Sequence, residues 1–225
     1  AHLVGCDIKE IMLGSTGVIG FRLDMDKIKA GIEDAYMKLS YEGGALAAKA
    51  IMTTDTFPKE ASAQFELDQH IITVGGMAKG SGMIHPNMAT MIGVITTDAG
   101  ISVNMLQKAL REAVAKTFNR VSVDGETSVC DMVLILANGK AGNPAIEQED
   151  SRYAEFRQAL EQVCMALSRR IAMDGEGATK LVEVLVEGAS CADDAYKVVS
   201  AVSRSPLVKT ALFGEDANWG RILTA

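Results

Sequence analysis

Residues 75–98 constrain the fold of this chain more than any other stretch. They begin with glycines at positions 75, 76, 80 and 82 around a single cation, Lys79. Glycine allows backbone N–H groups to approach an anion or a carbonyl oxygen, so this stretch predicts a loop that binds such groups. The run 91–97 is apolar and β-branched, which predicts a buried strand. The sequence therefore predicts a glycine-rich loop leading into the core.

Thr90 lies where this loop meets the predicted strand. Because threonine is β-branched, its hydroxyl is held in few directions. Cleavage of the bond between Ala89 and Thr90 would free an α-amino group with a pKa of about 8, which suits a general base. A threonine paired with its own α-amine is a known form of activated nucleophile. The residue pattern alone also allows a simpler role, in which Thr90 caps a strand.

His85 offers a second route to the same chemistry. It could act as a conventional base for Thr90, as in Ser–His pairs. Its place immediately before Pro86 also fits an extended residue of a turn, and we favour this interpretation.

Four further positions are candidates for binding, and each has a plainer alternative. A small-residue turn at Thr16 and Gly17 follows a predicted strand and would expose backbone N–H groups; the alternative is a structural turn. Thr53, Lys79 and Glu176 are the other candidates for binding a ligand. The plainer alternatives are that Thr53 is a polar residue on a strand and that Lys79 is a solvated surface charge. Glu176, which lies between two glycines, could simply be an exposed acidic residue of a turn.

Hydrophobic periodicity predicts helices and strands that alternate along the chain. We expect helices over 24–39, 45–50, 104–118, 152–173 and 191–203. We expect strands over 11–13, 65–67, 71–74, 91–97, 132–137, 181–186 and 209–213. Asp68 and Gln69 form the turn of a hairpin, and Trp219, the only tryptophan, is expected to be a buried anchor. This alternation predicts a mixed α+β fold.

Composition excludes several classes of protein. A net charge of −7 argues against a general nucleic-acid surface, which needs a basic stripe. The four cysteines are widely spaced and there are only three histidines, so no metal-ligand cluster is expected. Free thiols indicate a reducing cytosol, and no apolar run approaches the length of about 18 residues that a membrane span needs.

Five motifs, in order along the chain, resemble the ornithine acetyltransferase (glutamate N-acetyltransferase) family. They are residues 15–20, 51–59, 81–91, 174–180 and 213–221. The resemblance implies stacked α/β/β/α layers similar to N-terminal-nucleophile hydrolases. It also implies self-cleavage between Ala89 and Thr90, with Thr90 as the nucleophile.

The resemblance also assigns roles to the other candidates. Thr16 and Gly17 would form the oxyanion hole, and Thr53, Lys79, Glu176 and Thr90 itself would contact substrate. The implied reaction moves an acetyl group from N-acetylornithine to glutamate in arginine biosynthesis, without a metal or other cofactor. Whether acetyl-CoA is also a donor stays open.

The implied assembly is a cytoplasmic heterotetramer of two alpha and two beta chains that binds neither nucleic acid nor membrane. Residues 1–89 would be the C-terminal part of the alpha-chain region and residues 90–225 the N-terminal part of the beta-chain region, together one interleaved catalytic unit. By comparison with the family, the chain is expected to lack the first quarter and the C-terminal stretch. Two alternatives remain: an N-terminal-threonine amidohydrolase or aminopeptidase, and a non-cleaving protein that binds small amino acids.

Overall fold

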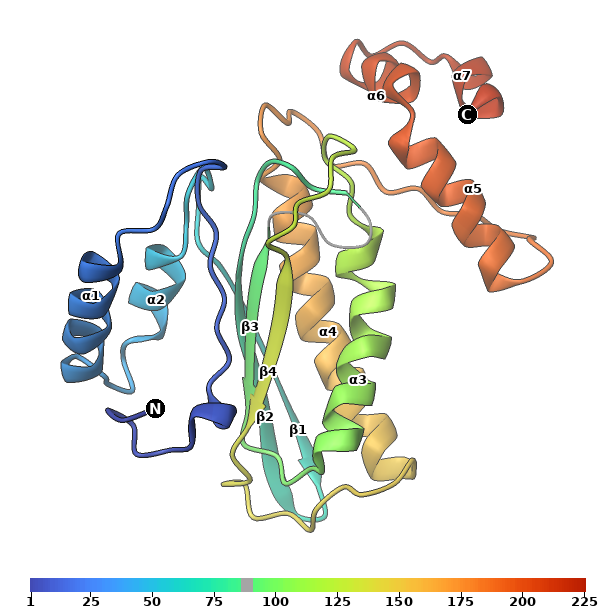
Figure 1. Ribbon diagram of the computed structural model, residues 1–225. Coiled ribbons are helices and arrows are strands. Elements are labelled where there is room, and N and C mark those ends of the chain that lie inside the picture. Colours follow the sequence, from blue (N-terminus) through green and yellow to red (C-terminus); the bar gives the residue numbers. More distant parts are fainter. Residues whose placement is uncertain (86–90) are drawn as a thin grey trace.

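The computed structural model describes residues 1–85 and 91–225, and its centre is one four-stranded sheet (Figure 1). The strands are β1 (Lys59–Leu67), β2 (His70–Lys79), β3 (Ile92–Thr97) and β4 (Met132–Ala137), in the order β1-β2-β3-β4. The pairs β1/β2 and β2/β3 are antiparallel, whereas β3 and β4 are parallel. The predicted strands 91–97 and 132–137 are therefore confirmed.

The predicted hairpin is confirmed, and its strands are longer than the sequence indicated. Asp68 and Gln69 both have positive φ, 49° and 66°, as the tight two-residue turns that match strand twist require. The prediction that Gly75 and Gly76 belong to a loop is wrong, because both lie inside β2. A Cβ on Gly76 would lie 3.2 Å from side-chain atoms of both Ile95 and Leu167, so glycine here serves close packing.

Two helices cover one face of the sheet and form the core with it. They are α3 (Val103–Lys116) and α4 (Ser151–Met173), and both were predicted. Buried apolar side chains of the strands meet those of α4; the largest are Ile72, Val74, Ile95, Phe156, Leu160, Val163, Leu167 and Ile171. Each such side chain contributes about 1.5–3 kcal/mol on burial, so this layer contributes strongly to stability.

The N-terminal part lies on the opposite side of the sheet from α3 and α4 (Figure 1). It contains the 3₁₀ helix η1 (Ile8–Glu10) and the helices α1 (Met25–Met37) and α2 (Gly44–Ala50). Both α-helices were predicted, but α1 has no buried residue, so its apolar stripe does not enter the core. Residues 11–13 are extended outside any strand, and the strand predicted there is wrong.

The C-terminal part is helical, with α5 (Ala192–Arg204), α6 (Pro206–Phe213) and α7 (Trp219–Thr224). The predicted helix at 191–203 is confirmed, whereas the strand predicted at 209–213 is wrong. Ser205 accepts from the amide of Val208 and Pro206 occupies the first turn, so this segment begins as a capped helix. The strand at 181–186 is also wrong, and Trp219 is 71% exposed rather than a buried anchor.

The α+β class is confirmed. Among the described residues there is one sheet, bordered by a helical pair on one face and by the N-terminal helices on the other. None of the helices in the described ranges combines the length and the apolar character needed to cross a bilayer.

Candidate active site

Three strand ends meet at one edge of the sheet. Lys79, the last residue of β2, is paired with Ile92, the first of β3, which in turn is paired with Met132, the first of β4. Thr90 and Ala89 lie outside the described residues. Met91, which follows Thr90 in the chain, is buried with 3% of its surface exposed. The strand that Thr90 precedes therefore begins beside Lys79.

Beneath this edge lies a line of buried charges of alternating sign. The Lys59 ammonium lies between two carboxylates, 2.7 Å from Asp55 Oδ1 and 2.6 Å from Asp174 Oδ2. The Lys79 ammonium is 3.9 Å from the other oxygen of Asp55. Lys59 and Asp55 have no exposed side-chain surface. Buried charges are tolerated when they are paired and hydrogen-bonded, as the Lys59 ammonium is with both carboxylates.

The two carboxylates stay ionised despite their burial. Burial by itself raises the pKa of Asp55, but hydrogen bonds from the Gly80 amide and the Lys59 ammonium together bring that pKa below its ordinary value. For Asp174, burial is likewise outweighed by hydrogen bonds from Lys59 and from Thr56, so its pKa is also lowered. Their contribution to stability is therefore present above the ordinary range of aspartate and is lost as the pH falls through the lowered values.

Lys79 is 3% exposed, so the alternative that it is a solvated surface charge is wrong. The ammonium is held at the end of β2, with Asp55 as its counter-charge. A lysine fixed in this way can pair with the carboxylate of a small ligand at the edge of the sheet. Its assignment to substrate stays a prediction.

Glu176 lies against the loop that follows β2. Its amide donates to Ser81 O at 2.9 Å, and the Ser81 hydroxyl donates to Asp174 O at 2.6 Å. A Cβ on Gly82 would lie 2.5 Å from the Glu176 carboxyl carbon, so glycine permits this approach. The turn after α4 is thereby fixed to the loop that carries the chain toward Thr90, with the Glu176 side chain exposed.

The segments with Thr16 and Thr53 reach the same end of the sheet. A Cβ on Gly14 would lie 2.0 Å from Met132 Sδ, so the N-terminal segment, which Figure 1 shows running along β4, passes close to the start of that strand. Thr16 is half-buried and Gly17 exposed. Thr53 is exposed, and its amide donates to Asp55 Oδ2 at 3.2 Å.

His85 is buried, and its Nδ1 lies 3.3 Å from the Ser122 hydroxyl. Burial lowers the pKa of His85, and the nearby cations Arg204 and Lys209 lower that pKa further. The ring is therefore neutral at physiological pH. Its role toward Thr90 stays open, because Thr90 is not among the described residues.

Sequence reasoning missed the four charged residues Asp55, Lys59, Asp131 and Asp174. A local signal existed for two of them, since Asp55 and Lys59 are opposite charges at i and i+4 on either side of Pro58. Asp131 directly precedes a predicted buried strand, where a carboxylate is unusual. Asp174 was visible only as the first residue after a helix, and its partner Lys59 is 115 positions away.

Asp131 is the one of these carboxylates that resists ionisation. Burial raises its pKa to about 6, although the Met91 amide and the Lys79 charge both lower it. Its Oδ1 accepts from Met91 N at 2.8 Å. Its Oδ2 is buried and has no hydrogen-bond partner among the residues that the structure describes. Asp131 is therefore a titrating group that is hydrogen-bonded to the amide of Met91, the residue after Thr90 in the sequence.

The Asp131→Asn variant is expected to gain stability over the parent as the pH rises from about 4 to about 6. Between about pH 4 and pH 6 the Asp131 carboxyl is ionised in the unfolded chain but still protonated in the folded chain. The free energy of unfolding of the parent therefore falls across this window and is constant, as far as Asp131 is concerned, at higher pH. At 1.36 kcal/mol per pKa unit the gain is at most about 2–3 kcal/mol, and water near the half-buried side chain reduces it. Urea unfolding of both chains across this range measures it, and a difference independent of pH would contradict it.

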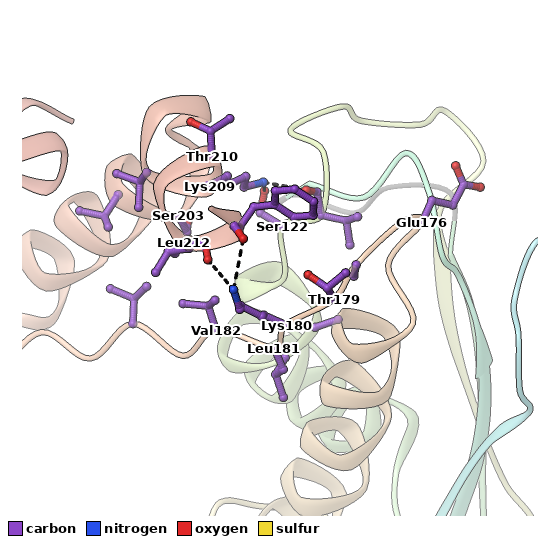
Figure 2. Close-up of a pocket in the computed structure, with 18 residues that line it drawn as sticks. Ser122, Glu176, Thr179, Lys180, Leu181, Val182, Ser203, Lys209, Thr210 and Leu212 are labelled. Atoms are coloured by element: carbon purple, nitrogen blue, oxygen red, sulfur yellow. Dashed lines mark hydrogen bonds between the residues drawn. The ribbon is translucent and has the colours of Figure 1, made fainter. Parts of the chain in front are cut away.

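A cavity of about 370 Å³ lies between the turn after α4 and the C-terminal helices (Figure 2). Two of its lysines are already engaged. Lys180 donates to the carbonyls of Leu212 and Phe213 at the end of α6, and Lys209 donates to Val123 O at 2.7 Å. Glu176 lies at the far side of the cavity from Lys209 in Figure 2. This cavity is a gap between packed segments of the chain. The edge of the sheet that carries Lys79 and its buried ion pairs is the better candidate site.

Together, the fold and this edge define a mixed α+β protein in which a line of buried ion pairs supports Lys79 at the end of β2, in register with the first residue of β3. The model of the ArgJ family matches residues 1–225, and the chain belongs to that family.

Curated relatives support this membership. The chain is 58% identical to the arginine biosynthesis bifunctional protein ArgJ of Symbiobacterium thermophilum and 50% identical to that of Caldanaerobacter subterraneus subsp. tengcongensis. Each match covers 100% of this chain and 56% of the relative, so the chain spans about half the length of these proteins. The crystal structure of ArgJ from Bacillus halodurans is similar at 47% identity and a TM-score of 0.55, over 59% of this chain and 62% of that one.

Proposed function

We propose that this chain forms part of an acetyltransferase that moves the acetyl group of N-acetylornithine to glutamate, in arginine biosynthesis, with Thr90 as the nucleophile. The observation that carries the proposal is the buried Lys79 ammonium at the end of β2, paired in register with the start of the strand that Thr90 precedes. The names of the ArgJ relatives support the same pathway.

Thr90 would first become an N-terminal residue by self-cleavage. Its Oγ attacks the carbonyl carbon of Ala89, the bond from that carbon to the Thr90 nitrogen breaks, and the hydroxyl proton passes to the nitrogen. Water then hydrolyses the ester, which leaves a carboxylate on Ala89 and restores the Thr90 hydroxyl. The freed amine, with a pKa of about 8, is then the base for that hydroxyl. Residues 1–89 and 90–225 become the two chains of one catalytic unit.

The transfer reaction would follow in two halves. Thr90 Oγ attacks the acetyl carbonyl of N-acetylornithine, and ornithine leaves after its nitrogen takes a proton. The amine of glutamate then attacks the acetyl ester and regenerates Thr90. Backbone donors at Thr16 and Gly17 would stabilise each oxyanion, a contribution of about 2.7–4 kcal/mol per donor in comparable sites. Thr53, Lys79 and Glu176 would orient the amino-acid groups of the substrates.

The proposal extends to the assembly, the location and the acetyl donors of the enzyme. We propose a cytoplasmic assembly of two alpha and two beta chains without a metal or organic cofactor, with acetyl-CoA as an alternative acetyl donor. An amidohydrolase with the same nucleophile is the second candidate, because water could replace glutamate as acceptor. Acetate released from N-acetylornithine at an equal rate with and without glutamate would favour that candidate.

Intact mass under denaturing conditions tests the proposal. We expect two fragments, the second beginning at Thr90, and this fragment should gain the mass of one acetyl group when N-acetylornithine is added. Glutamate should remove that acetyl group and release N-acetylglutamate. A chain that stays in one piece and takes up no acetyl group would contradict the proposal.

A further inference from the structure

One loop, residues 122–131, holds the chain on the N-terminal side of residues 86–90. The Asp124 carboxylate accepts two backbone hydrogen bonds there, from Met83 N to Oδ2 at 2.6 Å and from Ile84 N to Oδ1 at 3.0 Å. Hydrogen bonds to an ionised carboxylate are shorter and stronger than those between neutral groups. Asp124 therefore fixes the backbone immediately before His85.

The same loop holds the chain on the other side of that segment. Asp131 Oδ1 accepts from Met91 N at 2.8 Å, and Met132 N donates to Met91 O at 3.1 Å. The nitrogen of Met91 is bonded to the carbonyl carbon of Thr90, so the first hydrogen bond holds the peptide group that Thr90 shares with Met91. One loop thus carries a carboxylate for each flank of the proposed cleavage site.

The N-terminal flank has an uncommon backbone conformation next to the Asp124 carboxylate. Met83 has a φ of 55°, a left-handed conformation that residues other than glycine adopt rarely. Asp124 holds this residue in place, and its Oδ1 also accepts from the amide of Glu126 at 3.0 Å, which keeps the loop itself in shape. Val123 N adds a bond to Ile84 O at 2.8 Å. These contacts stabilise the conformation of the N-terminal flank.

We propose that Asp124 and Asp131 are positioning residues for self-cleavage: they clamp both flanks of the segment that contains the bond between Ala89 and Thr90. The inference rests on the proposed function. Fixing the ends of a short segment limits the conformations between them, and intramolecular attack gains rate when its reacting groups are held close to the attack geometry. The clamp assigns a purpose to the loop 122–131, which the proposed chemistry does not otherwise use.

The rate of cleavage tests the clamp. The conversion of the full-length chain into two fragments is followed by mass spectrometry during cell-free synthesis. We expect Asp124→Ala and Asp131→Ala each to slow cleavage by about tenfold or more, because each loses charge-assisted bonds to one flank. Asp124→Asn and Asp131→Asn keep an amide oxygen as acceptor and should recover part of the rate. Glu126→Ala removes an exposed carboxylate of the same loop and is the matched control, expected to cleave within about twofold of the parent.

The pH dependence separates positioning from folding. Among the described residues, the charged group that acts on Asp131 is Lys79 on β2, whose ammonium also lies 3.9 Å from Asp55 Oδ2. Since burial raises the pKa of Asp131 to about 6, the rate of the parent should fall as the pH drops below that value. The Asp131→Asn variant should lack this acidic limb. A folding defect alone would lower the rate at every pH without removing the limb.

The outcomes distinguish this inference from the proposed function. A parent chain that never cleaves overturns both. A parent that cleaves, with Asp124→Ala and Asp131→Ala cleaving at its rate, overturns the clamp alone. If either alanine variant fails to fold, as judged by circular dichroism, the asparagine variants decide: cleavage at the parent rate with the parent pH profile overturns the clamp.

Discussion

The Thr90→Ala chain is expected to remain a single species of the full mass, 23.9 kDa, and to transfer no acetyl group. Alanine lacks the hydroxyl that attacks the Ala89 carbonyl, so neither the ester nor the free amine can form. Loss of an enzyme nucleophile commonly lowers the rate on the order of 10⁶-fold, which places both reactions below detection. Intact mass and release of N-acetylglutamate measure the two effects separately.

Two matched variants interpret this result. Thr90→Ser keeps a hydroxyl and an α-amine, and it should still cleave, because the chemistry needs the oxygen rather than the methyl group. Thr96→Ala removes a hydroxyl from an exposed position on β3 and should cleave like the parent. Division of the Thr90→Ala chain at the same bond would rule out the mechanism.

The Lys59→Met variant is expected to lower the free energy of unfolding by about 3–5 kcal/mol. Methionine fills similar space, but it leaves the buried carboxylates of Asp55 and Asp174 without their shared cation. Removing one partner of a buried ion pair has this cost because an uncompensated charge stays in the interior. Urea unfolding, carried out in the Thr90→Ala background so that one uncut chain is followed, measures the change.

The chain offers a close control for this substitution. Lys38 and Asp34 are also four residues apart with an N–O distance of 2.7 Å, the same distance as between Lys59 and Asp55, but their side chains are 72% and 62% exposed. Exposed pairs contribute about 0–1 kcal/mol, so Lys38→Met should have little effect. Equal losses in the two variants would show that burial does not strengthen the ion pair. Adding Asp55→Asn and Asp174→Asn to Lys59→Met should recover part of the loss.

The sequence by itself determined the elements with strong local signals. The hairpin around Asp68 and Gln69, the strand before Asp98 and the helices α3 and α4 follow from turn chemistry and hydrophobic period, which act over a few residues. The motif around Thr90 and the cation at Lys79 were likewise visible, because the order of residue types carries that chemistry.

Short apolar runs were the weak point of sequence reasoning. The run 209–213 fits a strand or a buried helix equally well, and the cap at Ser205 with Pro206 decides for the helix. The run 181–186 has the composition of a strand, yet it is not part of the four-stranded sheet. A strand forms only where a neighbouring strand is available to pair with it, and the local composition does not indicate whether such a neighbour exists.

The charged site was decided by the tertiary structure. Lys59 meets Asp174 across 115 positions, and Met91 meets Asp131 across 40, so no local pattern could connect them. Burial also converted Lys79 from an ordinary surface residue into a held charge and moved the pKa of Asp131 to about 6. Distance along the chain hides such pairs, because the electrostatic energy of a group depends on its neighbours in space and on how far water is excluded.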